Sequence, residues 1–105
     1  MYMSKQSFAL SVSKLPTKKF SVLFTNKVTG RENTIHFGAK GYEDYTQTSD
    51  AEAKKSYRLR HAKDYIEDIA KPGAWSWWLL WNKPTLKDSI KSMEDHFKIV
   101  IISSV

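Results

Sequence analysis

The chain has 105 residues, no cysteine and a formal net charge of +6 at pH 7. A length of this order suits one domain, so we expect a single domain over residues 1–105. The lack of cysteine excludes a disulfide framework, a thiolate zinc site and a cysteine nucleophile. No apolar run approaches the roughly 20 residues of a membrane helix, and the first residues lack the apolar core of a signal peptide. We therefore expect no membrane insertion and no secretion.

The positive charge is confined to the N-terminal third. Residues 1–41 contain seven Lys or Arg against one Glu, which gives +6, whereas residues 42–105 contain ten basic and ten acidic residues, which gives zero. Attraction to phosphate or to an acidic protein surface should be strongest in residues 1–41. A charge of this size also fits a role in solubility alone.

The basic part, residues 1–41, has the alternation of strands. Phe8, Leu10 and Val12 alternate with small polar residues, and residues 20–24 repeat the pattern. A polar turn with Gly30 and a short apolar alternation follow, so we expect a β-hairpin over 19–37. The two glycines at 38 and 41 predict a tight loop that leaves the sheet.

The part over 42–97 is predicted to be helical. Ser49 and Glu52 have the spacing of a capping box, and Pro72 ends the pattern, so we expect a polar loop over 42–48 and a helix from 49 to about 70. Tyr57, His61 and Tyr65 would share its core face with Ala62, Ile66 and Ile69. Basic residues come early and acidic residues late, which opposes the helix dipole. Either other parts of the fold neutralise the basic end or solvent covers it, or it faces an anionic ligand.

All four tryptophans lie in the window 75–81. Tryptophan combines a large apolar surface with an indole donor and is common both in cores and in contact surfaces. In a short helix over 74–81, Trp75, Trp78 and Leu79 share one side, which we expect to be core. Trp77 and Trp81 point elsewhere and are candidates for contact with another protein.

The last elements are a helix and a strand. Leu86, Ile90, Met93 and Phe97 recur at helical spacing behind a Thr85 cap, which predicts an amphipathic helix over 85–97. The β-branched run 98–102 predicts a C-terminal strand within 98–105 that is apolar on both faces. Such a strand is an inner strand or is covered by a partner, which makes Ile101 a third protein-contact candidate.

These elements predict an α+β fold. We expect a small antiparallel sheet of three or four strands, formed by the N-terminal hairpin and the C-terminal strand. Two main helices and the short Trp-rich helical segment would cover it.

No catalytic motif is present. The sequence lacks phosphate-binding loops and zinc-protease patterns, and His36, His61 and His96 are scattered. Glu43 and Asp44 could hold a divalent ion, and Asp64 lies one turn from His61, but adjacent loop carboxylates are usually solvated turn residues. We expect no catalytic residue, no metal ligand and no cofactor.

Three blocks carry a resemblance: HFGAKGYEDYT at 36–46, KKxYxxRH at 54–61 and WSxWLLWNKPTLKxSI at 75–90. Together they resemble a family of small uncharacterised proteins encoded by large double-stranded DNA viruses of the algal-virus type. The resemblance implies a viral setting and names no activity. This chain departs from those relatives at Ala74, where they often have an aromatic residue, and at Trp77, where they often have a basic one.

Two functions of different classes follow. The first is a non-enzymatic structural component of a large DNA virus particle, such as a minor capsid protein, located in the virion or host cytoplasm and bound to capsid proteins or other proteins in an assembly or oligomer. The second is a DNA- or RNA-binding protein whose phosphate contacts are basic residues of the N-terminal third and the first long helix: Lys18, Lys19, Lys27, Arg31, Lys40, Arg58 and Arg60. A small metal-dependent nuclease using Glu43 and Asp44 is a remote alternative.

Overall fold

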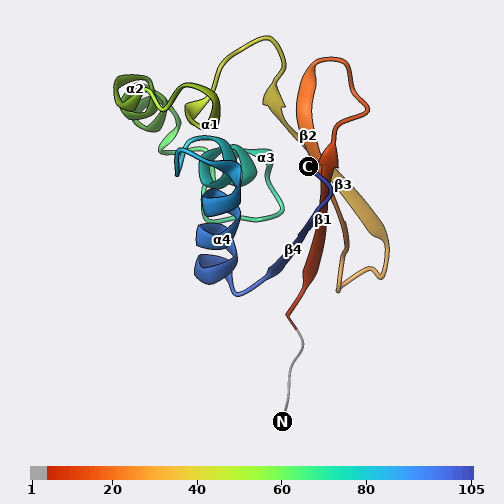
Figure 1. Ribbon diagram of the computed structural model, residues 1–105. Helices are drawn as coiled ribbons and strands as arrows, with labels where there is room; N and C mark the ends of the chain where they lie inside the picture. The colour runs from red at the N-terminus through yellow and green to blue at the C-terminus, as the bar shows by residue number, and fades with distance from the viewer. Residues whose placement is uncertain (1–4) are drawn as a thin grey trace.

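The computed structural model describes residues 5–105, and these form an α+β fold. Four strands make one sheet in the order β3-β2-β1-β4, and the helices lie on one side of it (Figure 1). The strands are β1 (Ser7–Val12), β2 (Lys18–Thr25), β3 (Glu32–Ala39) and β4 (Val100–Ser103). The predicted fold class is confirmed.

The predicted hairpin is confirmed as β2 and β3, which pair antiparallel, and β1 pairs antiparallel with β2. The turn between β2 and β3 closes when Gly30 N donates to the Asn26 carbonyl at 2.7 Å. Gly30 has a φ of +73°, a conformation that glycine adopts without a steric cost. The polar turn and its glycine therefore set the register of the hairpin.

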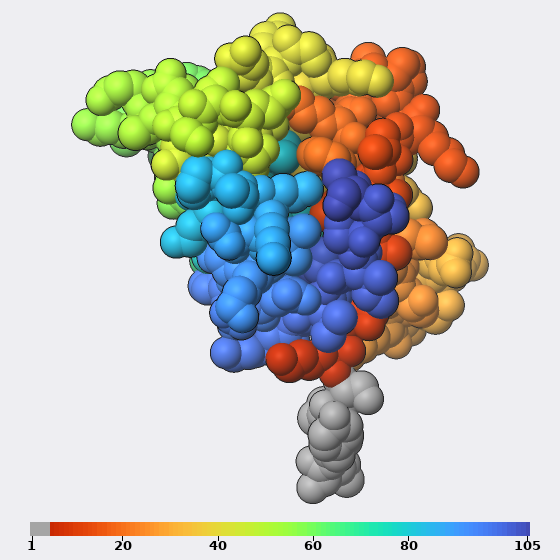
Figure 2. All heavy atoms as spheres, viewed as in Figure 1, coloured from red at the N-terminus to blue at the C-terminus, as the bar shows by residue number. Residues whose placement is uncertain are grey.

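The sheet is mixed, whereas the sequence predicted an antiparallel one. β4 pairs parallel with β1, because α4 carries the chain back along the sheet before β4 begins. β4 is also an edge strand, so the inner position offered as one alternative is wrong. Ile101 packs into the core, while Ile102 on the opposite face is 61% exposed. Figure 2 shows the C-terminal residues, in dark blue, at the surface beside α4.

The helices follow the prediction in part. They are α1 (Tyr45–Thr48), α2 (Ala51–His61), α3 (Pro72–Trp75), the π-helix η1 (Ser76–Leu80) and α4 (Leu86–Phe97). α4 is confirmed, and its Thr85 Oγ1 accepts a hydrogen bond from Asp88 N at 3.2 Å. α1 lies in the segment that was predicted to be a polar loop. In residues 5–105, no helix has both the length and the apolar character needed to cross a membrane.

The helix predicted over 49–70 is wrong at both ends. Ser49 ends α1 with a φ of 54°, and the carboxylate of Asp50 caps α2 by accepting from Glu52 N and Ala53 N. α2 stops at His61 and has no fully buried residue. The predicted core face is wrong for Tyr65, which is 70% exposed, whereas Tyr57 and His61 are half-buried.

A reversal of the chain explains the early end of α2. A Cβ atom on Gly73 would lie 2.4 Å from the Asp64 carbonyl oxygen, so these two residues touch. In a continuous helix, residues nine apart are separated by roughly 13 Å. The segment 62–71 instead folds over the tryptophans, where the Ile69 carbonyl accepts from Trp75 Nε1 at 2.9 Å and the Ile66 carbonyl accepts from Trp78 Nε1 at 2.8 Å.

The tryptophan segment supplies the centre of the core. Trp75 is fully buried and packs against the rings of Phe8 and Phe37, at centroid distances of 5.1 and 6.1 Å. The buried partners on its own segment are Leu79 and Leu80, whereas the sequence predicted Trp78 and Leu79. A π-helix bonds residues five apart, so positions four and five residues after Trp75 return to its side. Trp78 is half-buried and stacks on His96 at 4.2 Å.

Candidate functional site

A hollow of about 390 Å³ lies between α2 and the open end of the β2–β3 hairpin, where β2 begins and β3 ends. We call it the basic aromatic groove. The hairpin and the loop that follows it form one wall. The other wall comes from α2 and η1. The side chains that line it are cationic, acidic or aromatic for the most part: Lys18, Lys19, Gly38, Ala39, Tyr42, Glu43, Asp44, Tyr57, Arg60, His61, Ser76 and Trp81.

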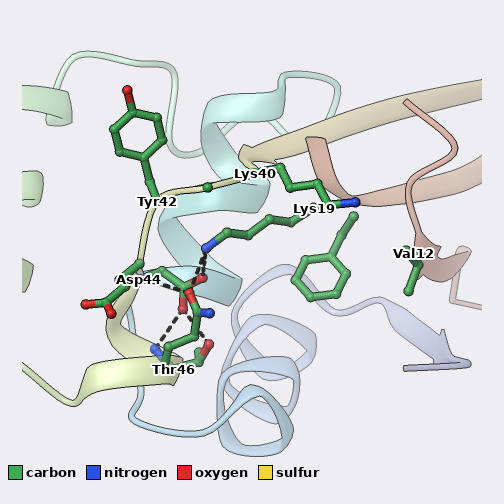
Figure 3. A pocket seen from close by; sticks show the side chains of 10 residues that line it. Val12, Lys19, Lys40, Tyr42, Asp44 and Thr46 are labelled. Carbon is green, nitrogen blue, oxygen red and sulfur yellow. Dashed lines mark hydrogen bonds and ion pairs between the residues drawn. The ribbon is translucent and has the colours of Figure 1, made fainter. Parts of the chain in front are cut away.

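A buried ion pair forms the floor of the groove. Lys19 Nζ donates to Asp44 Oδ2 at 2.6 Å and to Gln47 Oε1 at 2.8 Å. The Asp44 carboxylate also accepts from Thr46 N and thereby caps α1; Figure 3 shows these residues from an adjoining hollow that Lys19 and Asp44 also line. Only 3% of Asp44 is exposed, so it is not the solvated turn residue that the sequence favoured. The pair joins the sheet to the helical side of the molecule.

Three stacked rings form the wall on the α2 side, two of them from α2 itself and one from Trp81. The Tyr57 ring lies parallel to Trp81 at 4.5 Å and against His61 at 4.3 Å. Burial raises the pKa of the Tyr57 phenol to about 12, and the nearby Asp64 carboxylate adds to the increase. Both faces of the Tyr57 ring are therefore occupied by other side chains of the same chain.

Two cations of α2 fasten this helix to the tryptophan segment and to the residue that follows it. Arg58 lies over the Trp77 ring at 4.4 Å, and its Nε donates to the Trp81 carbonyl at 3.1 Å. Lys54 Nζ donates to the Asn82 carbonyl at 2.6 Å. Burial lowers the pKa of Lys54, and the charges of Arg58 and Lys83 lower it further. These contacts are intramolecular, and Arg60 is the Lys or Arg of α2 that lines the groove.

A second surface is formed by the sheet face that carries no helix, and we call it the outer sheet face. Its side chains alternate along the strands with those of the core: Ser7, Ala9, Ser11, Ser21, Leu23, Thr25, Thr34, His36, Val100 and Ile102. Ala9 lies in register between Ile102 and Leu23, and this row is apolar. A hollow of about 410 Å³ includes Ser11, Ser21 and Leu23 together with the 14–15 turn.

A model for the family of unknown function DUF5754 matches residues 8–61. The matched part is slightly more than half of the 105 residues. The chain belongs to this family. The match spans β1, β2, β3, α1 and α2, so it includes the whole lining of the basic aromatic groove except Ser76 and Trp81. The searches of curated proteins and of solved structures gave no match.

The predicted nucleic-acid contacts do not form one patch. Lys18, Lys19 and Arg60 line the groove, and Lys40 lines the adjoining hollow of about 510 Å³. Lys27 and Arg31 lie in the turn at the other end of the hairpin, a distance of about 25 Å along a strand of this length. Arg58 is held on Trp77. Basic residues that are close in sequence are thus divided among three places.

The predicted protein contacts are largely covered within the chain. Trp77 and Trp81 are half-buried beneath Arg58 and Tyr57, respectively. Ile101 is buried in the core. Their contact with another protein stays a prediction. The outer sheet face was not identified from the sequence, although the alternation of Ser7, Ala9 and Ser11 with core residues was its signal.

The three histidines in the described part of the chain each contact one side chain that can share a hydrogen bond or a charge. The Asp64 carboxylate pairs with His61, and Glu67 Oε2 lies 2.6 Å from His96 Nε2. His36 Nδ1 lies 2.7 Å from Ser13 Oγ. Within residues 5–105, no group of three or more His, Asp or Glu side chains could hold a metal ion. Asp44 is already paired with Lys19, so Glu43 and Asp44 do not present two free carboxylates.

Proposed function

We propose that this chain is a non-enzymatic structural component of a large DNA virus particle that binds other proteins through its outer sheet face. The main supporting observation is the apolar row that runs over three strands of this face, from Ile102 through Ala9 to Leu23. Ile102 is 61% exposed and Leu23 is 42% exposed. Exposed apolar side chains that lie together on an uncovered sheet face are common interface material.

The charge distribution favours protein over nucleic acid at this face. Charged side chains lie at its two ends, with Lys14 in the 13–17 loop and Glu32 at the start of β3, next to the hairpin turn. Between them the face carries hydroxyl and apolar side chains and the imidazole of His36. The cores of protein interfaces are depleted in charge, whereas phosphate binding needs Lys or Arg.

The geometry of β4 favours face-to-face contact over strand addition. The Glu94 carboxylate accepts a hydrogen bond from Ile101 N at 2.9 Å. This side chain occupies a donor that an added strand would need, and blocking an edge strand in this way limits edge-to-edge pairing. The partner should therefore pack on the face of the sheet.

The viral setting is supported by the three sequence blocks, which resemble small proteins of large DNA viruses. The proposed partners are capsid proteins, and the proposed location is the virion or the host cytoplasm. The test is quantitative mass spectrometry of purified particles before and after a wash in 1 M salt, about the concentration at which exposed charges are screened beyond 3 Å. Retention of the chain is expected, because apolar contacts survive high salt. Its absence from particles, or its loss in the wash, would overturn the proposal.

A further inference from the structure

We infer that the basic aromatic groove binds a backbone phosphate and an unpaired base of single-stranded nucleic acid. This inference is independent of the proposed protein contact. The lining of the groove and the side chains of the outer sheet face share no residue.

Two cations face the groove from its opposite walls. Lys18 comes from the start of β2 and Arg60 from the last turn of α2. Neither has an ion-pair partner in the described part of the chain, whereas Lys19 is neutralised by Asp44. A phosphate between Lys18 and Arg60 would receive charge from both sides. Glu43 also lines the groove and opposes an anion, so its removal should tighten binding.

A free aromatic ring stands at the same place. Tyr42 is 75% exposed and lines both the groove and the adjoining hollow. The other tyrosine of the groove, Tyr57, is covered on both faces by Trp81 and His61. Exposed aromatic rings beside cations are the usual platform for unpaired bases. Bases inside a duplex are already stacked, so Tyr42 should select single strands.

The volume agrees with a short ligand. About 390 Å³ lies in the range of small-molecule sites, and the basic residues of the hairpin turn are at the far end of the sheet. The groove should therefore engage about one phosphate, with a log–log salt slope of roughly −0.7 for a single strand.

The test is fluorescence anisotropy with a labelled ten-nucleotide oligothymidylate, an equally long duplex, thymidine monophosphate and inorganic phosphate, in 50 and 200 mM salt. We expect the single strand to bind at least fivefold tighter than the duplex. Lys18→Ala and Arg60→Ala should each weaken binding several-fold, and Tyr42→Ala should weaken it about fivefold or more, as expected for one stacked base. Tyr42→Phe should retain binding, and Glu43→Gln should increase it.

The matched control is Lys91→Ala, which removes one exposed charge from α4. Equal weakening by Lys91→Ala and Lys18→Ala would show diffuse attraction and overturn the inference. Equal affinity for duplex and single strand, or no binding in 50 mM salt, would also overturn it. If thymidine monophosphate displaces the oligonucleotide and inorganic phosphate does not, the site contacts the base. If inorganic phosphate displaces it as well as thymidine monophosphate does, the role of Tyr42 is refuted. Circular dichroism of each variant separates a binding defect from misfolding.

Discussion

Replacement of Asp44 by alanine should lower the free energy of unfolding by about 3 kcal/mol. Loss of one partner of a buried ion pair costs about 3–5 kcal/mol, because the other charge stays buried. Lys19 keeps its hydrogen bond to Gln47, and 14% of its side chain is exposed, so the lower end of that range applies. The figure includes the helix cap that Asp44 provides to α1, which alone contributes about 1 kcal/mol.

Urea denaturation followed by circular dichroism measures this change. With a slope of about 1.5 kcal/mol per molar, the midpoint should fall by roughly 2 M. Glu43→Ala is the matched control, because Glu43 is the adjacent carboxylate and is exposed, and it should change stability by less than about 0.5 kcal/mol. The double variant Asp44→Ala, Lys19→Met should be more stable than Asp44→Ala alone. Equal effects of Asp44→Ala and Glu43→Ala would refute the buried pair.

Two further predictions concern Tyr57 and Gly38. Burial raises the Tyr57 pKa from 10.0 to about 12, so the contribution of the protonated phenol to stability is complete below pH 10 and is lost as the pH rises toward 12. Absorbance titration should show a phenolate step near pH 12 that Tyr57→Phe lacks. Identical titration curves for the two proteins would contradict this. A Cβ on Gly38 would lie 2.8 Å from Leu80 Cδ1, whereas one on Gly30 would have open space at a similar φ. Gly38→Ala should therefore cost about 1–2 kcal/mol more than Gly30→Ala in urea unfolding, and equal costs would show that Leu80 yields.

Local periodicity was sufficient to predict the hairpin and α4. The apolar positions Leu86, Ile90 and Met93 follow the helical period, and Thr85 caps the helix as its sequence predicts. Alternation likewise identified Phe8 and Leu10 as inward-facing residues. In these elements, the local pattern and the tertiary packing favour the same structure.

The length of α2 was mispredicted despite a signal in its charges. Over 49–70 the charge order opposes the helix dipole, but over Ala51–His61 it agrees with it. Glu52 lies in the first turn, and Arg58 and Arg60 lie in the last turn. The apparent conflict was therefore evidence that the predicted helix was too long. The carbonyls of the segment 62–71 accept the tryptophan indoles, and no local pattern predicts that contact.

The groove could not be predicted because its parts are distant in sequence. Lys18, Tyr42, Arg60 and Trp81 meet only after the sheet forms and α2 folds against the tryptophan segment. Similarly, the π-helix changed which tryptophan neighbours are core, since helical periodicity assumes 3.6 residues per turn. The predicted nucleic-acid contacts lie in three separate places for a similar reason, because charge counts along the chain carry no information about which residues share a surface.

The outer sheet face is tested most directly by measuring association of the chain with the partner that we propose, the major capsid protein of a large DNA virus. Ile102→Glu should weaken association at least tenfold, because loss of a buried isoleucine contact costs roughly 1.5–3 kcal/mol. Leu59→Glu is the matched variant, since Leu59 is also exposed but lies on α2, and it should stay within twofold of the unchanged chain. Unchanged association of Ile102→Glu, or an equal loss in Leu59→Glu, would contradict protein contact through the outer sheet face.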